Sequence, residues 1–286
     1  MIYFSTGVYP KLSGVQAAEM FVGYGIKTIE LSGGKYESEM LKKLEALKRR
    51  YELKFQIHNY FPVPEKPFVF NLASRDKDIV TLSLNHARNA IEAANFLGSE
   101  YYSFHAGFLF DPSPQELGSA MKKKPLTDRL LGLSAFVENV GHLAEFARKH
   151  GITLLIENNV ISKRNYEYFS ANPLLMTEST ECKEIMEATP SNVQLLVDVG
   201  HVKVSACTMN FDPVSFLRET SAWTMAYHLS DNNGEEDRNE SLTNASWFWP
   251  HLNRELNYFS LEFSVCSRKA SDKQLELFEQ KQKVDS

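Results

Sequence analysis

Short apolar runs alternate with longer amphipathic stretches along the whole chain. A short apolar run is typical of a strand that a sheet buries on both faces, whereas apolar residues three and four positions apart predict a helix. The apolar runs predict strands at residues 2–8, 27–34, 54–60, 100–107, 152–159, 192–201, 224–232 and 258–264. The amphipathic stretches predict helices at residues 12–26, 37–52, 79–98, 128–151, 182–189 and 212–220.

This alternation predicts a parallel sheet covered by helices. Eight strands with their connections favour an α/β fold of the (β/α)8 type, a TIM barrel, and we expect one domain over residues 1–286. The structural rival is an open doubly wound sheet, which normally carries a GxGxxG turn after its first strand. The segment STGVYPKLSG lacks that turn. The two longest connections, residues 61–78 and 107–127, are rich in proline and lysine and are candidates for a lid.

Composition and charge narrow the class of protein. Hydrophobic residues make up 43% of the chain and charged residues 23%, as in a globular protein with a sizeable core. The formal net charge is -5 and no long basic run occurs, so nothing global draws the chain to nucleic acid or to an anionic membrane. The three cysteines lie far apart without CxxC spacing. Because the start of the chain lacks a signal-peptide pattern and no apolar run approaches a membrane span, we expect a cytoplasmic protein without membrane contact.

Acidic residues and histidines stand at the ends of the predicted strands. In a (β/α)8 barrel the active site is built where the strands end, at their carboxyl side. Seven of the eight predicted strands carry such a residue there, although the chain has only 36 Asp and Glu and 8 His in 286 residues. The seven residues are Glu30, His58, His105, Glu157, Asp198, His228 and Glu262.

Four of these residues form a candidate metal site. Carboxylates that converge in a partly dry pocket repel one another, and a divalent cation removes that conflict. Glu157, Asp198, His228 and Glu262 come from the fifth to eighth strands, and their three oxygen ligands and one imidazole suit Mn²⁺, Mg²⁺ or Zn²⁺. We expect His201 on the loop behind Asp198. Glu30 could hydrogen-bond a substrate or orient a neighbouring ligand, and we favour the second role.

As an ordered set, these motifs resemble the xylose-isomerase-like TIM barrels. That superfamily contains sugar and sugar-phosphate isomerases and epimerases, and also endonuclease-IV-type apurinic/apyrimidinic (AP) endonucleases. The resemblance covers essentially the whole chain. The segments that carry it are LLIENN, LLVDVGH, HLSDN followed by Asp237, SLEF, IH at 57–58 and FHAG at 104–107.

The resemblance to ketose epimerases implies a divalent-metal-dependent isomerase or epimerase. The four-residue metal site maps onto Glu157, Asp198, His228 and Glu262, and the two glutamates also act as the catalytic acid and base. One glutamate removes the proton beside a carbonyl and the other returns it, through a metal-stabilised enediolate. His201 would contact a substrate oxygen. The implied partner is a small carbohydrate, phosphorylated or not, and the sequence leaves homo-oligomer formation open.

The resemblance to AP endonucleases implies a different, zinc-dependent reaction. That family binds three zinc ions, and its first site would use His58, His105 and Glu157. Its third site needs a histidine two positions after Asp237, where this chain has Asn239. The only clustered lysines are at 122–124, so we expect nucleic acid not to be a partner. We therefore favour the isomerase or epimerase with one divalent cation, and we assign His58, His105, His201 and Asp237 to substrate or to a second cation.

Two other hypotheses remain open beside these. One is another metal-dependent lyase or hydrolase on the same fold. The other is a non-catalytic member that kept the fold as a scaffold. Such a member would usually lose at least one of the four predicted ligands, and this chain keeps all of them.

Overall fold

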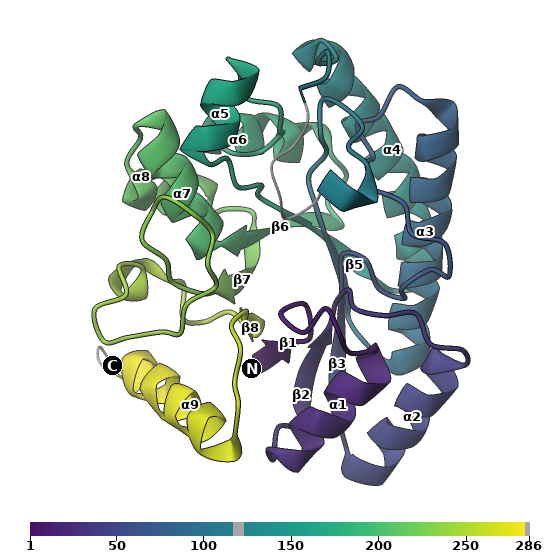
Figure 1. Cartoon of the computed structure of the whole chain (residues 1–286), viewed down its shortest axis with the longest axis vertical. Helices are drawn as coiled ribbons and strands as arrows, with labels where there is room; N and C mark the ends of the chain where they lie inside the picture. The colour runs from purple at the N-terminus through teal and green to yellow at the C-terminus, as the bar shows by residue number, and fades with distance from the viewer. Residues whose placement is uncertain (117–122, 284–286) are drawn as a thin grey trace.

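The computed structural model describes residues 1–116 and 123–283 and contains a closed barrel of parallel strands (Figure 1). Each strand pairs with the next along the chain, and β8 pairs with β1, with Ile2 opposite Phe259. This last pairing closes the sheet, so the predicted TIM barrel is confirmed and the open doubly wound sheet is excluded. The strands are β1 (Ile2–Ser5), β2 (Thr28–Leu31), β3 (Lys54–His58), β4 (Tyr101–His105), β5 (Thr153–Glu157), β6 (Val193–Asp198), β7 (Thr224–Leu229) and β8 (Phe259–Leu261).

Helices surround the strands on the outside of the barrel (Figure 1). Their bounds are α1 (Gly14–Gly23), α2 (Met40–Tyr51), α3 (Lys77–Leu97), α4 (Arg129–Lys149), α5 (Lys163–Phe169), α6 (Ser179–Ala188), α7 (Val199–Met209), α8 (Pro213–Thr220) and α9 (Arg268–Lys283). Short 3-10 helices span Pro114–Glu116 and Trp249–His251. The six predicted helices are all present, and the sequence did not predict α5, α7 and α9.

The start of α7 corrects one expectation. The strand expected at 192–201 ends at Asp198, and α7 begins at Val199. His201 therefore lies in the first turn of a helix and not on a loop. The Asp198 side chain makes this early start possible, because it accepts a hydrogen bond of 2.7 Å from the His201 backbone N–H and caps the helix.

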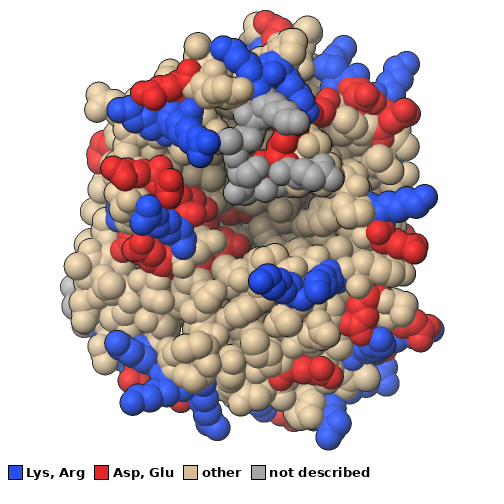
Figure 2. Space-filling view, in the orientation of Figure 1, with Lys and Arg blue, Asp and Glu red and all other residues tan. Residues whose placement is uncertain are grey.

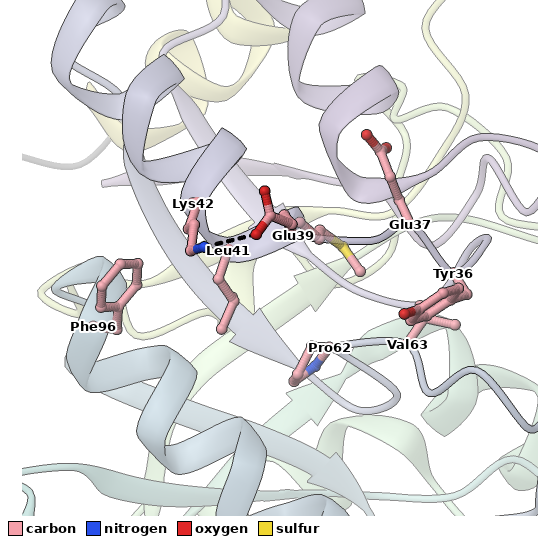
Figure 3. A pocket seen from close by; sticks show the side chains of 9 residues that line it. Tyr36, Glu37, Glu39, Leu41, Lys42, Pro62, Val63 and Phe96 are labelled. Atoms are coloured by element: carbon pink, nitrogen blue, oxygen red, sulfur yellow. Dashed lines mark hydrogen bonds and ion pairs between the residues drawn. The ribbon is translucent and has the colours of Figure 1, made fainter.

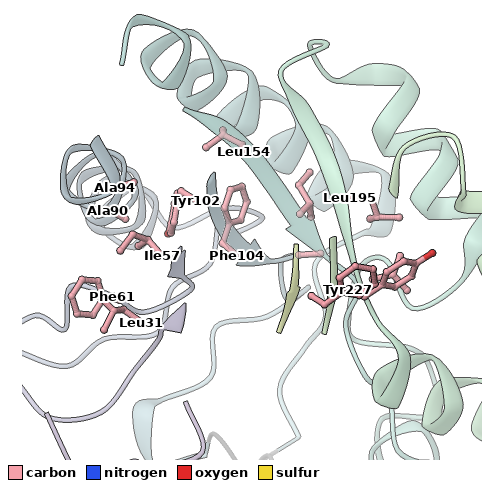
Figure 4. Close-up of a cluster of buried hydrophobic side chains, with 14 of the residues drawn as sticks. Leu31, Ile57, Phe61, Ala90, Ala94, Tyr102, Phe104, Leu154, Leu195 and Tyr227 are labelled. Carbon is pink, nitrogen blue, oxygen red and sulfur yellow. The ribbon is translucent and has the colours of Figure 1, made fainter. Parts of the chain in front are cut away.

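Side chains along each strand alternate between two environments. Those that point outward pack against the helices, as Ile57 of β3 does near Ala90 and Ala94 of α3 (Figure 4). Those that point inward fill the barrel, because successive side chains of a strand face opposite sides of the sheet. Toward the start of the strands the inward positions form a buried cluster, here called the lower layer: Tyr3, Leu155, Leu196, Ala226 and Tyr258.

Candidate metal centre at the barrel mouth

Eight predicted site residues converge above the lower layer, at the carboxyl ends of the strands. We call them the mouth cluster: His58, His105, Glu157, Asp198, His201, His228, Asp237 and Glu262. Three of them occupy the next inward positions of strands that also contribute to the lower layer, since Glu157, Asp198 and His228 follow Leu155, Leu196 and Ala226 by two residues. Five of the eight have less than 7% of their surface exposed, and Glu157, Asp198 and His228 have none.

The four predicted metal ligands face one another. One donor atom from each of Glu157, Asp198, His228 and Glu262 can be chosen so that all four atoms lie within 4.8 Å of one another. His228 Nδ1 is central to the group. It lies 3.1 Å from Glu157 Oε1, 3.2 Å from Glu262 Oε2 and 3.9 Å from Asp198 Oδ2. The geometry thus brings together the set that the sequence predicted, and its role as a ligand set stays a prediction.

A second group shares Glu157 with the first. Glu157 Oε2 lies 3.2 Å from His105 Nδ1 and 3.4 Å from His58 Nε2, and donor atoms of these three residues also lie within 4.8 Å of one another. The His58 ring packs edge-on against His105 and His228, with ring centroids 5.5 Å and 4.8 Å apart. The single carboxylate of Glu157 therefore faces imidazoles from three other strands.

His201 and Asp237 complete the cluster on the side of α7. His201 Nδ1 lies 2.8 Å from the Asn158 carbonyl oxygen, and this hydrogen bond leaves Nε2 facing Asp237 Oδ2 at 3.2 Å. A side chain on Gly200 would place its Cβ 2.6 Å from Ser230 Oγ, so glycine is needed for the helix to start this close to the mouth. The prediction that His201 acts near the site is compatible with this position.

Burial and like charge act together on Asp198. Burial is the main cause that raises the pKa of this carboxyl group to about 8. His201 opposes the rise, and the nearby carboxylates of Asp237, Glu157 and Glu262 add to it.

Opposite charge dominates at His228. Burial by itself lowers the pKa of the imidazole, but the carboxylates of Glu30, Glu157 and Glu262 outweigh burial and hold that pKa well above its ordinary value. At Glu157 the directions are reversed. Burial by itself raises the pKa of the carboxyl group, but the surrounding histidines, led by His105 and His228, outweigh burial and hold that pKa well below its ordinary value. These opposed shifts belong to a pocket in which carboxylates outnumber the positive groups next to them.

Unpartnered atoms test whether a cation suits this pocket. Glu157 Oε2, Asp198 Oδ2 and His105 Nδ1 are buried and make no hydrogen bond among residues 1–116 and 123–283, although Glu157 Oε2 and His105 Nδ1 face each other at 3.2 Å. Buried polar atoms nearly always make a hydrogen bond, so three such atoms without one in a single pocket are unusual. All three are atoms that divalent cations accept as ligands. The residues present therefore fit a divalent cation.

A polar network lies directly behind the mouth cluster, and the sequence revealed only part of it. Glu30 Oε2 lies 2.9 Å from His228 Nε2, and the Tyr258 hydroxyl donates a hydrogen bond to the same oxygen. Ser103 Oγ lies 3.0 Å from His58 Nδ1. Residues two positions apart on a strand face the same side of the sheet. Tyr258 lies four positions before Glu262, and Ser103 lies two positions before His105, so this alternation could have predicted that both side chains point into the barrel.

The two long connections suggested as a lid are joined beside the mouth. Asn71 donates hydrogen bonds to the carbonyl oxygens of Phe108 and Phe110 at 3.1 and 3.2 Å, and it accepts one from the Phe108 N–H. Part of the second connection, 117–122, lies outside the described residues, as does Lys122 of the lysine cluster. Lys124 Nζ donates to the Asp111 carbonyl oxygen at 2.7 Å. A lid function of these segments stays a prediction.

A hollow opens at the centre of the face drawn in Figure 2, over the ends of β6 and β7, and acidic side chains gather along one side of it.

A separate cavity of about 430 Å³ lies elsewhere, between the start of α2, the Phe61–Pro62 turn and the end of α3 (Figure 3). Its walls are mostly apolar, with a Lys42–Glu39 ion pair at 2.6 Å, and none of its lining residues belongs to the mouth cluster. The candidate metal-binding residues therefore lie in the barrel mouth and not in this cavity.

The family model for the xylose isomerase-like TIM barrel matches residues 13–277, and the chain belongs to this family. A relative described as an uncharacterized protein of Methanocaldococcus jannaschii is 26% identical over 197 residues, which are 69% of this chain and 58% of that protein. The chain thus matches less than two thirds of this relative's length. No helix within the described residues is long and apolar enough to cross a membrane.

Solved structures of two functional classes share the fold. A D-tagatose 3-epimerase-like protein is similar with a TM-score of 0.75 and 20% identity, over 99% of this chain and 97% of that chain. An AP endonuclease, family 2, from Brucella melitensis is similar with a TM-score of 0.65 and 13% identity, over 94% of this chain and 95% of that chain. At these identities the likeness shows the fold alone, so the site residues must decide between reactions.

Proposed function

We propose that this protein is a divalent-metal-dependent isomerase or epimerase of a sugar or sugar phosphate. The observation that carries the proposal is the convergence of Glu157, Asp198, His228 and Glu262, whose donor atoms lie within 4.8 Å of one another. Family membership and the similarity to an epimerase-like protein support the same class of reaction. The substrate class is a small carbohydrate, because the reaction needs a carbonyl beside a carbon that bears hydrogen and hydroxyl.

Glu157 and Glu262 are the proposed acid and base. When bound by the four ligands, a divalent cation such as Mn²⁺, Mg²⁺ or Zn²⁺ would polarise the substrate carbonyl and its neighbouring hydroxyl. One glutamate then removes the proton from the carbon beside the carbonyl, and the other returns a proton. Return on the opposite face gives an epimer, whereas transfer to the next carbon on one face gives an isomer.

The environments of the two glutamates differ in a way that suits separate roles. Glu157 is fully buried and held among imidazoles, with contacts of 3.2 Å to His105 and 3.1 Å to His228. Glu262 keeps 14% of its side chain exposed and contacts His228 at 3.2 Å. We assign His201 and Asp237, whose side chains meet at 3.2 Å, to holding a substrate oxygen.

Metal analysis combined with proton exchange tests this function. The protein is freed of metal, reloaded with Mn²⁺, Mg²⁺ or Zn²⁺ in turn, and offered free and phosphorylated ketoses in deuterated water. The expected result is one ion per chain, and metal-dependent entry of deuterium at one carbon of a ketose or its product. A metal-loaded protein that converts a sugar without ever exchanging solvent deuterium would contradict the proposed proton transfer.

A second candidate function has one observation in its favour. His58, His105 and Glu157 form a second group of donor atoms within 4.8 Å, as a multinuclear zinc site of the AP endonuclease kind would require. Asn239 stands against it, since an amide is a poor replacement for a zinc-bound imidazole. Cleavage of an abasic oligonucleotide by protein loaded with two or three Zn²⁺ ions would favour this candidate over the isomerase.

A further inference from the structure

A carboxylate outside the predicted ligand set lies directly behind His228. Glu30, from β2, has no exposed surface, and its Oε2 lies 2.9 Å from His228 Nε2. The Tyr258 hydroxyl, from the lower layer, donates to the same oxygen. The other nitrogen of the ring, His228 Nδ1, faces Glu157 and Glu262 at 3.1 and 3.2 Å. The imidazole thus has one nitrogen toward the proposed cation and the other toward Glu30.

Packing of the barrel interior does not by itself explain why residue 30 is a glutamate. Interiors of (β/α)8 barrels are usually packed with branched apolar side chains, and the lower layer of this barrel contains Leu155 and Leu196 in that role. A buried carboxylate is unfavourable unless its oxygens are paired. Within the described residues, Glu30 Oε1 has no hydrogen-bond partner, so the carboxylate is held mainly through Oε2. Such a residue is better explained by what it does for its partner than by packing.

We propose that Glu30 is a positioning residue for the metal ligand His228, and that Tyr258 holds Glu30 in place. Nε2 of His228 donates its N–H to Glu30, which keeps the ring in one orientation and leaves the lone pair of Nδ1 directed at the shared centre of Glu157, Asp198 and Glu262. A carboxylate behind a ligating histidine also makes the imidazole a stronger donor. This inference rests on the proposed function, because it assumes that His228 binds a cation.

Zinc titration of purified protein tests the inference without any sugar. The dissociation constant for Zn²⁺ is measured by calorimetry with a competing chelator for the wild type and for Glu30→Gln, which keeps the shape but removes the charge. We expect Glu30→Gln to bind Zn²⁺ about 10- to 100-fold more weakly. We expect Tyr258→Phe to weaken binding less, because Glu30 remains. The matched control is Tyr3→Phe, another lower-layer tyrosine, whose hydroxyl contacts Gln56 at 3.4 Å and which should bind Zn²⁺ like the wild type.

A second readout separates positioning from a general effect on folding. In the zinc-loaded wild type, proton NMR should show a downfield Nε2–H resonance of His228, and this resonance should move upfield in Glu30→Gln. Wild-type affinity in a folded Glu30→Gln variant would overturn the inference. If that variant does not fold, Tyr258→Phe decides, and unchanged affinity in it would overturn the inference equally. A wild-type protein that binds none of the tested cations would instead overturn the proposed function, and the inference with it.

Discussion

Strand β5 carries Leu155 in the lower layer and, two positions later, Glu157 in the mouth cluster. Strand β6 repeats this step from Leu196 to Asp198. The residues of each pair face the same interior and are equally buried, with no exposed surface. Burial therefore does not distinguish them, whereas their neighbours do: apolar side chains and tyrosine rings surround the leucines, and charged or polar groups surround the acids.

This difference separates stability from chemistry along a single strand. Apolar burial stabilises a fold in proportion to the area removed from water. Carboxylates gathered in the same interior oppose folding unless they are paired, and proteins accept that cost where an activity needs it. Substitution should therefore affect different properties at the two ends of the barrel interior: activity at the mouth cluster and stability in the lower layer.

The largest effect is expected from Glu157→Gln. Loss of a group that acts as acid or base should lower turnover by about 10³-fold, within the usual contribution of such a group. The measurement is deuterium exchange into the ketose identified by screening. Near-normal turnover would remove Glu157 from the mechanism.

The reverse pattern is expected from Leu155→Ala. Truncating a fully buried leucine should lower the free energy of unfolding by about 2–5 kcal/mol, measured by urea denaturation. Metal stoichiometry of the folded protein should stay unchanged, since the Leu155 side chain has no atom that binds a cation and Leu155 is not one of the candidate ligands. If this variant lost its cation while keeping its stability, the division between the two ends of the interior would be wrong.

The smallest effect concerns His86, a buried histidine outside the barrel interior. Its ring packs beside Tyr60 and Phe70, with centroids 5.0 and 5.8 Å away, and Nε2 lies 3.3 Å from the Asn59 carbonyl oxygen. Burial lowers the pKa of His86 to about 4, the opposite direction from His228, where carboxylates surround the ring. His86 thus shows what burial does to an imidazole without charged neighbours.

The pH dependence of stability follows from this lowered pKa. Between about pH 6.5 and pH 4 the unfolded chain binds a proton at His86 and the folded chain does not, so stability falls as the pH falls. At 1.36 kcal/mol for each pKa unit, the contribution of this shift is about 3 kcal/mol. His86→Gln should reduce this slope in urea denaturation measured from pH 7 to pH 4, with His142→Gln on the exposed side of α4 as control. An unchanged slope in His86→Gln would contradict the assignment.

The sequence predicted the fold because its eight apolar strands are short, buried and separated by connections that carry helical patterns. It predicted the mouth cluster because the carboxyl ends of all strands in a closed barrel surround the same opening. It did not predict α7, since seven of its eleven residues are buried and the segment shows no polar face to mark a helix. The sequence favoured Glu30 as a residue that orients a neighbouring ligand, but it did not identify His228 as that ligand, because the contact joins residues 198 positions apart and depends on how the barrel closes.

The two carboxylate oxygens of Asp198 have different surroundings: one caps helix α7 and the other faces the mouth cluster. Oδ1 accepts a hydrogen bond in the first turn of α7, whereas Oδ2 faces the imidazoles of His201 and His228 at 3.8 and 3.9 Å and has no hydrogen-bond partner in the described part of the chain. A descendant that abandoned the reaction would still be stabilised by a capping side chain here, and Asp198 already provides one. Retention of Asp198 in diverging homologues is therefore a weak sign of retained catalysis. Glu157 and Glu262 cap none of the described helices. Their loss in a homologue would therefore be a better sign that the homologue has lost its catalytic activity.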